Sequence, residues 1–143
     1  MATRNVADGG GPFAAMVVRG DEVVAEGVNR VTRDLDPTAH AEVVAIRAAC
    51  RALGAHLLRG TVLVSSCEPC PLCLSAALWA RVDGVVYAAD RHDAARGGFD
   101  DRAFYELFDR PRETWEMSVR QVPVDGATGP FEAWLATADR VEY

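Results

Sequence analysis

The chain has no lysine, so all 15 of its basic residues are arginine, and 21 acidic residues give a formal net charge of −6. Such an acidic domain lacks the positive surface that binds a phosphate backbone, which disfavours nucleic acid as a partner. No apolar run approaches the ~18 residues of a membrane span, and residues 1–11 lack the apolar segment of a secretory signal. We therefore expect one domain of 143 residues in the cytoplasm, with a small-molecule substrate and no membrane partner.

Cysteine is scarce and unevenly placed. Of the four cysteines, Cys67, Cys70 and Cys73 fall within seven residues, whereas Cys50 stands apart. In a cytoplasmic protein this crowding suits metal binding better than a framework of disulfides.

The hydrophobic pattern indicates alternating strands and helices. Two β-rich runs, residues 13–19 and 23–29, flank Gly20-Asp21 and predict a hairpin. Further strands are predicted over 61–65, 85–89 and 115–122, and helices over 36–54, 71–81, 101–108 and 131–138. This order predicts an α/β layer fold whose sheet is at least partly parallel, with its site at the carboxyl ends of strands.

One histidine and two cysteines have the pattern of a zinc site. Cys70 and Cys73 lie three residues apart at the predicted start of a helix, where free N–H groups and the helix dipole favour the thiolate that binds metal. With His40 they provide three ligands for tetrahedral zinc, which leaves one coordination position open for water. Glu42 is then placed to move the protons of that water, so the set predicts a hydrolytic site.

Two objections to an enzymatic site have to be met. Cys67 could supply a fourth ligand and close the site as a structural zinc, which would make the chain a zinc-stabilised binding module. Residues two apart in a helix also point to nearly opposite sides, so His40 and Glu42 meet at one metal only if both lie in the first turn. Pro37 and Thr38 indicate that the helix starts there.

The motif His40-Ala41-Glu42 with Pro69-Cys70-Pro71-Leu72-Cys73 matches the H-x-E…P-C-x-x-C signature of the zinc-dependent cytidine deaminase superfamily. Within it the chain resembles the bacterial guanine deaminases over nearly its whole length, and Gly98-Phe99-Asp100-Asp101 and the terminal Tyr143 point to that branch. The resemblance implies a three-layer α/β/α sandwich around a mixed, partly parallel five-stranded sheet. It also implies Zn²⁺ as cofactor and hydrolytic deamination of guanine to xanthine and ammonia.

Related substrates remain alternatives on the same scaffold: guanosine or another nucleoside, cytosine, or an amino-triazine such as ammeline. Sites distinguish such rings by buried hydrogen-bonding groups, where an unmatched group costs about 1–3 kcal/mol. Few of these contacts can be inferred from sequence. The tRNA-editing adenosine deaminases share the zinc motifs, but the acidity of this chain and its ending at Tyr143 argue against that activity.

The resemblance also implies roles for single residues. It makes His40, Cys70 and Cys73 the zinc ligands. Protons would be handled by Glu42 and by a second carboxylate, Asp101. The substrate would be contacted by Phe13, Asn29, Ala41, Trp79 and Tyr143.

Several of these residues have structural alternatives. Asn29 is equally well a turn residue, and phenylalanine and tryptophan at positions 13 and 79 are more often part of a core. Asp100 or Asp101 could cap the helix that begins at Arg102, but two adjacent acids leave one of them free.

The two ends of the chain carry further expectations. In enzymes of this kind the C-terminal segment, here residues 124–143, can cross to the partner subunit, so a domain-swapped homodimer is implied. Family members usually begin with a helix ahead of the Gly-Gly-Pro-Phe stretch, whereas Met1–Gly9 is too short for a full helix. We therefore expect another element, or the partner, to cover that face of the sheet.

Overall fold

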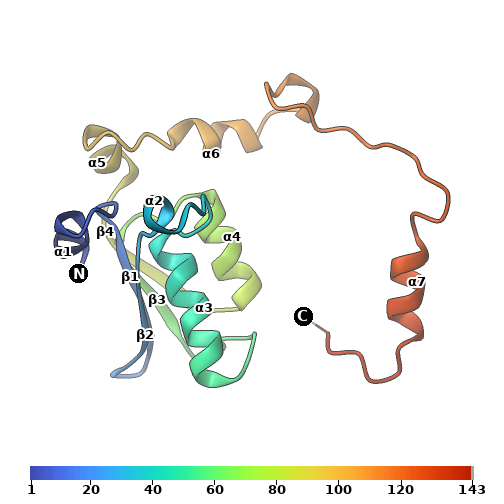
Figure 1. Cartoon of the computed structure of the whole chain (residues 1–143), viewed down its shortest axis with the longest axis horizontal. Coiled ribbons are helices and arrows are strands. Elements are labelled where there is room, and N and C mark those ends of the chain that lie inside the picture. The colour runs from blue at the N-terminus through green and yellow to red at the C-terminus, as the bar shows by residue number, and fades with distance from the viewer. Residues whose placement is uncertain (143) are drawn as a thin grey trace.

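The computed structural model describes residues 1–142 (Figure 1). Its elements are α1 (Ala2–Ala7), β1 (Ala14–Arg19), β2 (Glu22–Val28), α2 (Val31–Asp34), α3 (Ala41–Leu53), β3 (Val62–Cys67), α4 (Pro71–Ala80), β4 (Gly84–Ala89), α5 (Arg91–Arg96), α6 (Arg102–Phe108), the 3₁₀ helix η1 (Arg112–Thr114) and α7 (Gly129–Ala136). No helix within this described range is long and apolar enough to cross a bilayer.

The strands form one mixed sheet in the order β2-β1-β3-β4. β1 is antiparallel to β2 and β3, whereas β3 and β4 are parallel. The predicted hairpin is confirmed, with Ala14 paired to Val28 and Arg19 to Glu22. Its turn places Gly20 at φ +57°, a conformation that costs glycine little.

Helices α3 and α4 cover one face of the sheet (Figure 1). Each connects two parallel strands, and because such connections are right-handed and run the same way along the sheet, both helices lie on the same side. α3 ends at Gly54, which takes φ +62°, and α4 begins at Pro71, so both predicted boundary signals are confirmed.

Small side chains dominate the core between these helices and the sheet. Its buried members are Ala15, Val17, Ala41, Ala45, Ile46, Ala49, Leu58, Leu63, Ala77 and Ala80. Backbones therefore approach closely: a Cβ added to Gly27 would lie 2.3 Å from the carbonyl oxygen of Ala41 and 2.5 Å from the backbone nitrogen of Ala45. Glycine at position 27 of β2 thus allows the first turn of α3 to pack directly on the strand.

The sheet has four strands, not the expected five. Residues 115–122, predicted as a strand, follow η1 and form no strand within the described chain. A strand needs a neighbour to pair its N–H and C=O groups, and this segment leads away from the sheet (Figure 1). β4 is consequently an edge strand.

The α/β class is confirmed, but a complete three-layer sandwich is not formed by residues 1–142 of one chain. The face opposite α3 and α4 carries Val23 and Val86, which are 48% and 52% exposed. α3 and α4 supply one helical layer, and α7, the last helix, lies apart from the sheet (Figure 1).

The N-terminal segment also differs from expectation, because α1 forms within Met1–Gly9. Short helices depend on tertiary packing rather than on intrinsic propensity. Here the buried Asn5 side chain donates hydrogen bonds to the carbonyl oxygens of Gly11 and Asn29, both outside the helix. These contacts were not visible in the local sequence pattern.

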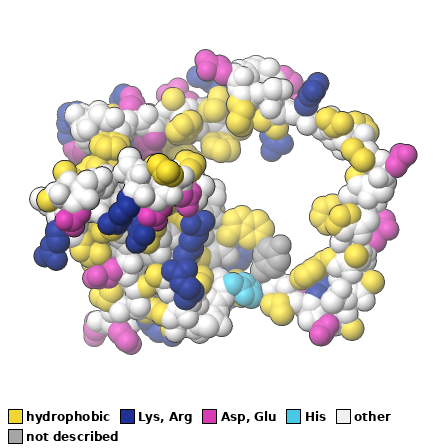
Figure 2. Space-filling view, viewed as in Figure 1, with side chains coloured by type: hydrophobic (Ala, Val, Ile, Leu, Met, Phe, Trp, Pro, Cys, Tyr) yellow, Lys and Arg dark blue, Asp and Glu magenta, His cyan; other side chains and the backbone are white. Residues whose placement is uncertain are grey.

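Residues 109–142 form an arm that leaves the body after α6. Figure 2 shows an open space between this arm and the body. The helix predicted over 131–138 is found there as α7, and its Phe131 and Leu135 are 70% and 67% exposed. Val141 returns to an apolar groove on the outer face of α3 and α4, beside Trp79.

We predict that Gly27→Ala lowers the free energy of unfolding by about 1–3 kcal/mol, because the added methyl group meets the backbone of α3 and cannot be accommodated by a side-chain rotation. Urea denaturation followed by circular dichroism, at fixed zinc concentration, measures this change. Gly84→Ala is the matched control, since a Cβ there meets nothing within 4 Å. Equal stability of the two variants would contradict the close approach.

Candidate metal and active site

The first turns of α3 and α4 meet at the carboxyl end of β3, and the candidate ligands lie at this meeting point. His40 is the N-cap residue of α3 and Cys70 the N-cap residue of α4, both with extended backbone (φ −64°, ψ 153° and φ −65°, ψ 170°). Cys73 follows in the first turn of α4. Both helices therefore direct free N–H groups and the positive ends of their dipoles at one point.

The three donor atoms have the spacing of tetrahedral zinc. Cys70 Sγ and Cys73 Sγ each lie 3.5 Å from His40 Nδ1, and they lie 3.8 Å from each other. Zinc bonds of about 2.3 Å to sulfur and about 2.0–2.1 Å to nitrogen place tetrahedral ligands at about 3.5 Å (N to S) and about 3.8 Å (S to S). The donor set therefore fits Zn²⁺ in both chemistry and geometry.

The two thiols titrate as a pair. The hydrogen bond between the two sulfurs, with a contribution from His40, lowers the pKa of Cys70 to about 4. The pKa of Cys73 is raised, first by its hydrogen bond to Cys70 and then by burial, which disfavours a second negative charge. A divalent cation offsets that repulsion and allows both sulfurs to be thiolates.

Cys67 lies outside this group. Its Sγ contacts the backbone carbonyl of Asp90 at 3.6 Å. Among residues 1–142, His40, Cys70 and Cys73 are the only group of three or more histidine, cysteine or acidic side chains whose ligand atoms all lie within 4.8 Å of one another. The geometry therefore favours a three-ligand site over the closed Cys67-containing alternative.

Glu42 reaches the same site from the second residue of α3. It is buried, with Oε1 accepting a hydrogen bond from the Ser65 hydroxyl at 3.0 Å and Oε2 lying 3.3 Å from Cys73 Sγ. Because His40 caps the helix rather than belonging to it, its side chain and that of Glu42 can converge although they are two residues apart. Ser65, which sequence reasoning missed, holds the carboxylate from β3.

The predicted start of this helix is wrong by several residues. Asp36 Oδ1 accepts hydrogen bonds from both the backbone nitrogen and the hydroxyl of Thr38, which closes a turn, and the helix begins only at Ala41. An aspartate that bonds two residues ahead offers the backbone an alternative to helix. The same residue types serve at helix starts, so sequence could not separate the two cases.

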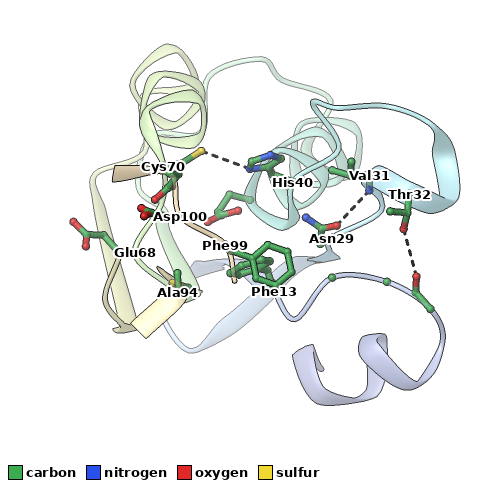
Figure 3. A pocket seen from close by; sticks show the side chains of 16 residues that line it. Phe13, Asn29, Val31, Thr32, His40, Glu68, Cys70, Ala94, Phe99 and Asp100 are labelled. Carbon is green, nitrogen blue, oxygen red and sulfur yellow. Dashed lines mark hydrogen bonds between the residues drawn. The ribbon is translucent and has the colours of Figure 1, made fainter. Parts of the chain in front are cut away.

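A cavity of about 490 Å³ adjoins the donor atoms (Figure 3). Its lining comes from the segment before β1, from β2–α2, and from the loops around α5 and α6. The lining residues are Gly9, Gly10, Gly11, Phe13, Asn29, Val31, Thr32, His40, Glu42, Cys67, Glu68, Cys70, Ala94, Phe99, Asp100 and Asp101.

Two of the predicted substrate contacts lie in this lining. Asn29 Oδ1 accepts a hydrogen bond from the backbone of Val31 at 3.3 Å, and its Nδ2 has no partner among the described residues (Figure 3). The Phe13 ring meets the Phe99 ring edge to face, with centroids 5.0 Å apart. An amide donor and an apolar aromatic wall therefore lie in one cavity. Phe99 was not predicted as a contact, although it lies within a stretch that carried the resemblance.

Asp100 and Asp101 have separate roles. Asp100 Oδ1 accepts a hydrogen bond from the backbone of Arg102 at 3.2 Å, and its carboxylate pairs with the Arg102 guanidinium, so it does the capping. Asp101 makes no side-chain cap, and its buried Oδ1 has no hydrogen-bond partner within residues 1–142. Burial, and next the neighbouring Cys70, raise the pKa of Asp101. As expected for two adjacent acids, one is free.

A chain of contacts fastens α6 to the loop that carries Cys70. Glu68 pairs with Arg91, whose guanidinium lies 3.6 Å from the centroid of the Tyr105 ring. The Tyr105 hydroxyl then donates to the carbonyl oxygen of Pro69 at 2.7 Å. Tyr105 thus fixes α6, and with it Asp101, against the metal loop.

The remaining predicted contacts are not brought to this cavity. Trp79 lies in the groove on the outer face of α3 and α4 and is 60% exposed, so within a single chain it does not line this cavity. α4 is apolar nearly all round, and its pattern could not show which side faces the site. Ala41 is fully buried beneath the site and does not line the cavity, while Tyr143 lies outside the described residues.

The comparison with known proteins agrees with this geometry. The family described as cytidine and deoxycytidylate deaminase zinc-binding region matches residues 1–89. The chain belongs to this family. It is 49% identical over 134 residues to guanine deaminase of Bacillus subtilis (strain 168), which covers 94% of this chain and 86% of that relative. The solved structure of a Bacillus subtilis guanine deaminase matches with a TM-score of 0.95 at 48% identity, covering 99% of this chain and 91% of that one.

Two more distant relatives show how the family varies. A protein solved in complex with 2,6-diaminopurine matches with a TM-score of 0.67 at 38% identity, over 70% of this chain and 57% of that one. A tRNA-specific adenosine deaminase of Aquifex aeolicus (strain VF5) is 34% identical over 117 residues, which are 82% of this chain and 75% of the relative. The predicted zinc-dependent deaminase class is therefore confirmed.

Replacing single cysteines tests the ligand set. We predict that purified Cys70→Ser protein loses its zinc, whereas Cys67→Ser keeps about one zinc per chain, because the geometry needs only three protein ligands. Elemental analysis of the purified variants measures both. Loss of zinc from Cys67→Ser would instead support the alternative of a structural zinc site with Cys67 as its fourth ligand.

Proposed function

We propose that this protein hydrolyses guanine to xanthine and ammonia. The single observation that carries the proposal is the cavity in which a zinc-spaced ligand set, the buried Glu42 and the free amide of Asn29 face one another. The 49% identity to a guanine deaminase over 94% of the chain supports the choice of guanine. The role would be purine base catabolism or salvage in the cytoplasm.

His40, Cys70 and Cys73 would hold the zinc. Bound zinc supplies Lewis acidity that makes water nucleophilic near neutral pH. Glu42 would take a proton as the oxygen of water bonds to the amino-bearing ring carbon, and would return it to the nitrogen as the C–N bond breaks. Ser65 leaves Oε2 of Glu42 facing the donors, because it holds Oε1.

Recognition of the ring would fall to the other cavity walls. The Nδ2 group of Asn29 can donate to acceptor atoms of a purine, and the edge-to-face pair of Phe13 and Phe99 offers an apolar wall to the ring. Asp101 would assist protonation of the leaving nitrogen, since it lines the cavity and its buried Oδ1 has no hydrogen-bond partner within residues 1–142. A buried amide left without its partner penalises rings that lack the matching atom.

Deamination of adenosine in tRNA, the activity of related enzymes, is less well supported for this chain. The chain carries no lysine and a net charge of −6, which does not suit a tRNA backbone. The alternative of a zinc-stabilised binding module is disfavoured as well. Cys67 lies outside the group of candidate ligands, and the buried Glu42 contacts a member of that group, Cys73.

We also propose that the working form is a homodimer with exchanged arms. The arm (residues 109–142) exposes Phe131 and Leu135, and the outer groove beside it exposes Trp79. Apolar surface of this extent is typical of an interface. Residues 115–122 could then pair with the free edge of β4 in a second copy, which would supply the fifth strand that one chain lacks.

Ammonia release from guanine, guanosine, cytosine, cytidine, adenine and ammeline tests the substrate. We predict that guanine is turned over with by far the highest kcat/KM, and that Glu42→Gln keeps its zinc but loses at least about 10²-fold in kcat, because the proton carrier is gone. A preference for any other ring would overturn the substrate, and an active Glu42→Gln protein would remove Glu42 from the mechanism.

Mixing two inactive variants tests the arm exchange. One variant carries Glu42→Gln with an intact arm, and the other keeps Glu42 but lacks Glu142 and Tyr143. If each arm completes the partner's site, co-refolding equal amounts restores about a quarter of wild-type activity, because half of the dimers are mixed and each has one complete site. No restoration would mean that each arm serves its own chain, and full activity of the truncated variant alone would remove the C-terminus from the site.

A further inference from the structure

The most unusual polar residue of the body is Asn5. It belongs to a helix of only six residues, yet just 4% of its surface is exposed. A buried amide is tolerated only when its hydrogen-bonding groups are paired. Both hydrogens of Asn5 Nδ2 are used, for the carbonyl oxygens of Gly11 and Asn29, each at 2.8 Å.

These two acceptors lie on opposite strands of the β1–β2 hairpin, just beyond its open end. The last ladder pair is Ala14 with Val28, and one more bond follows from the Asn29 nitrogen to the Phe13 carbonyl at 3.0 Å. Beyond that point the sheet provides no partner. The Asn5 amide instead connects the two segments that continue β1 and β2, where the next pair of backbone hydrogen bonds would otherwise form.

Both bridged segments line the cavity next to the metal ligands. Gly9, Gly10 and Gly11 form one rim, defined here as the glycine rim, and Asn29 forms the wall beside it. The Thr32 hydroxyl also donates to the carbonyl oxygen of Gly9 at 3.4 Å, and Figure 3 shows Thr32 close to Asn29. The position of the Asn29 side chain therefore depends on a bridge that starts in α1.

Two residues of the glycine rim, Gly10 and Gly11, have no space for a side chain. A Cβ on Gly10 would lie 2.3 Å from Asn5 Nδ2, and a Cβ on Gly11 would lie 2.9 Å from Asn29 Oδ1. Neither glycine has a positive φ, so close approach rather than backbone conformation explains them. Asn5, the rim and Asn29 pack as one unit.

We infer that Asn5 is a positioning residue for substrate recognition: it sets the separation of the glycine rim and Asn29, and so the placement of the Asn29 amide against the purine ring. This inference rests on the proposed guanine deamination. Asn5 touches neither the metal ligands nor Glu42 in the described structure, so its loss acts on binding of the ring rather than on proton transfer.

Asn5→Asp is the decisive variant, because it keeps the shape of the side chain but replaces the double donor with an acceptor. We expect its KM for guanine to rise roughly tenfold while kcat changes less than about twofold. Zinc content should equal that of the wild type. Gly10→Ala should give the same pattern, since it displaces Asn5 without altering it. Val6→Ala, a change on the exposed side of the same helix, is the matched control and should leave KM unchanged.

Amide hydrogen exchange separates this inference from the proposed function. Peptides covering residues 8–13 and 28–33 should exchange faster in Asn5→Asp than in Val6→Ala, whether or not guanine is the substrate. Wild-type protein that fails to deaminate guanine would overturn the function and leave this readout standing. Unchanged exchange and KM, or a parallel fall in kcat and zinc content, would show that Asn5 only stabilises the fold.

Discussion

The whole site depends on two helix starts that point at each other. The positive dipole ends of α3 and α4 converge, which is unfavourable unless negative charge lies between them. His40 and Cys70 occupy the two cap positions, and the thiolates of Cys70 and Cys73 with the carboxylate of Glu42 supply that charge. The arrangement is possible because Gly27 and the alanines of the core let the helix backbones pack close to the sheet. A metal cation completes the balance, since it offsets the repulsion between neighbouring anions.

Local pattern was enough for several element boundaries, although not for the start of α3. The hairpin around Gly20, the helix stop at Gly54 and the start of α4 at Pro71 follow from residues whose backbone preferences are strong. The zinc ligands followed from residue type and spacing, because few other constellations place a histidine, a glutamate and two cysteines in this way.

What the sequence could not show depends on distant partners. α1 exists because Asn5 finds acceptors in Gly11 and Asn29, and a nine-residue segment by itself gives no sign of them. The predicted strand over 115–122 is absent because strands need a neighbour. The position of Trp79 in the outer groove could not be inferred, because a helix that is apolar on every side does not reveal which face is buried.

The candidate metal ligands and part of the cavity wall lie in different parts of the chain. The zinc-binding family match ends at residue 89 and includes every candidate metal ligand and Glu42. The wall formed by Phe99 and Asp101 comes later, fastened through Arg91 and Tyr105 to the metal loop. The family match thus covers the metal ligands, whereas Phe99 and Asp101 lie beyond it.

Asn5 lies one helical turn after Met1, and its side chain reaches the cavity rim. Any peptide fused ahead of Met1, such as an affinity tag, would thus be joined to the helix whose Asn5 holds the cavity rim. Preparations intended for kinetics should accordingly carry a removable tag, since a permanent fusion would be a perturbation of the catalytic pocket itself.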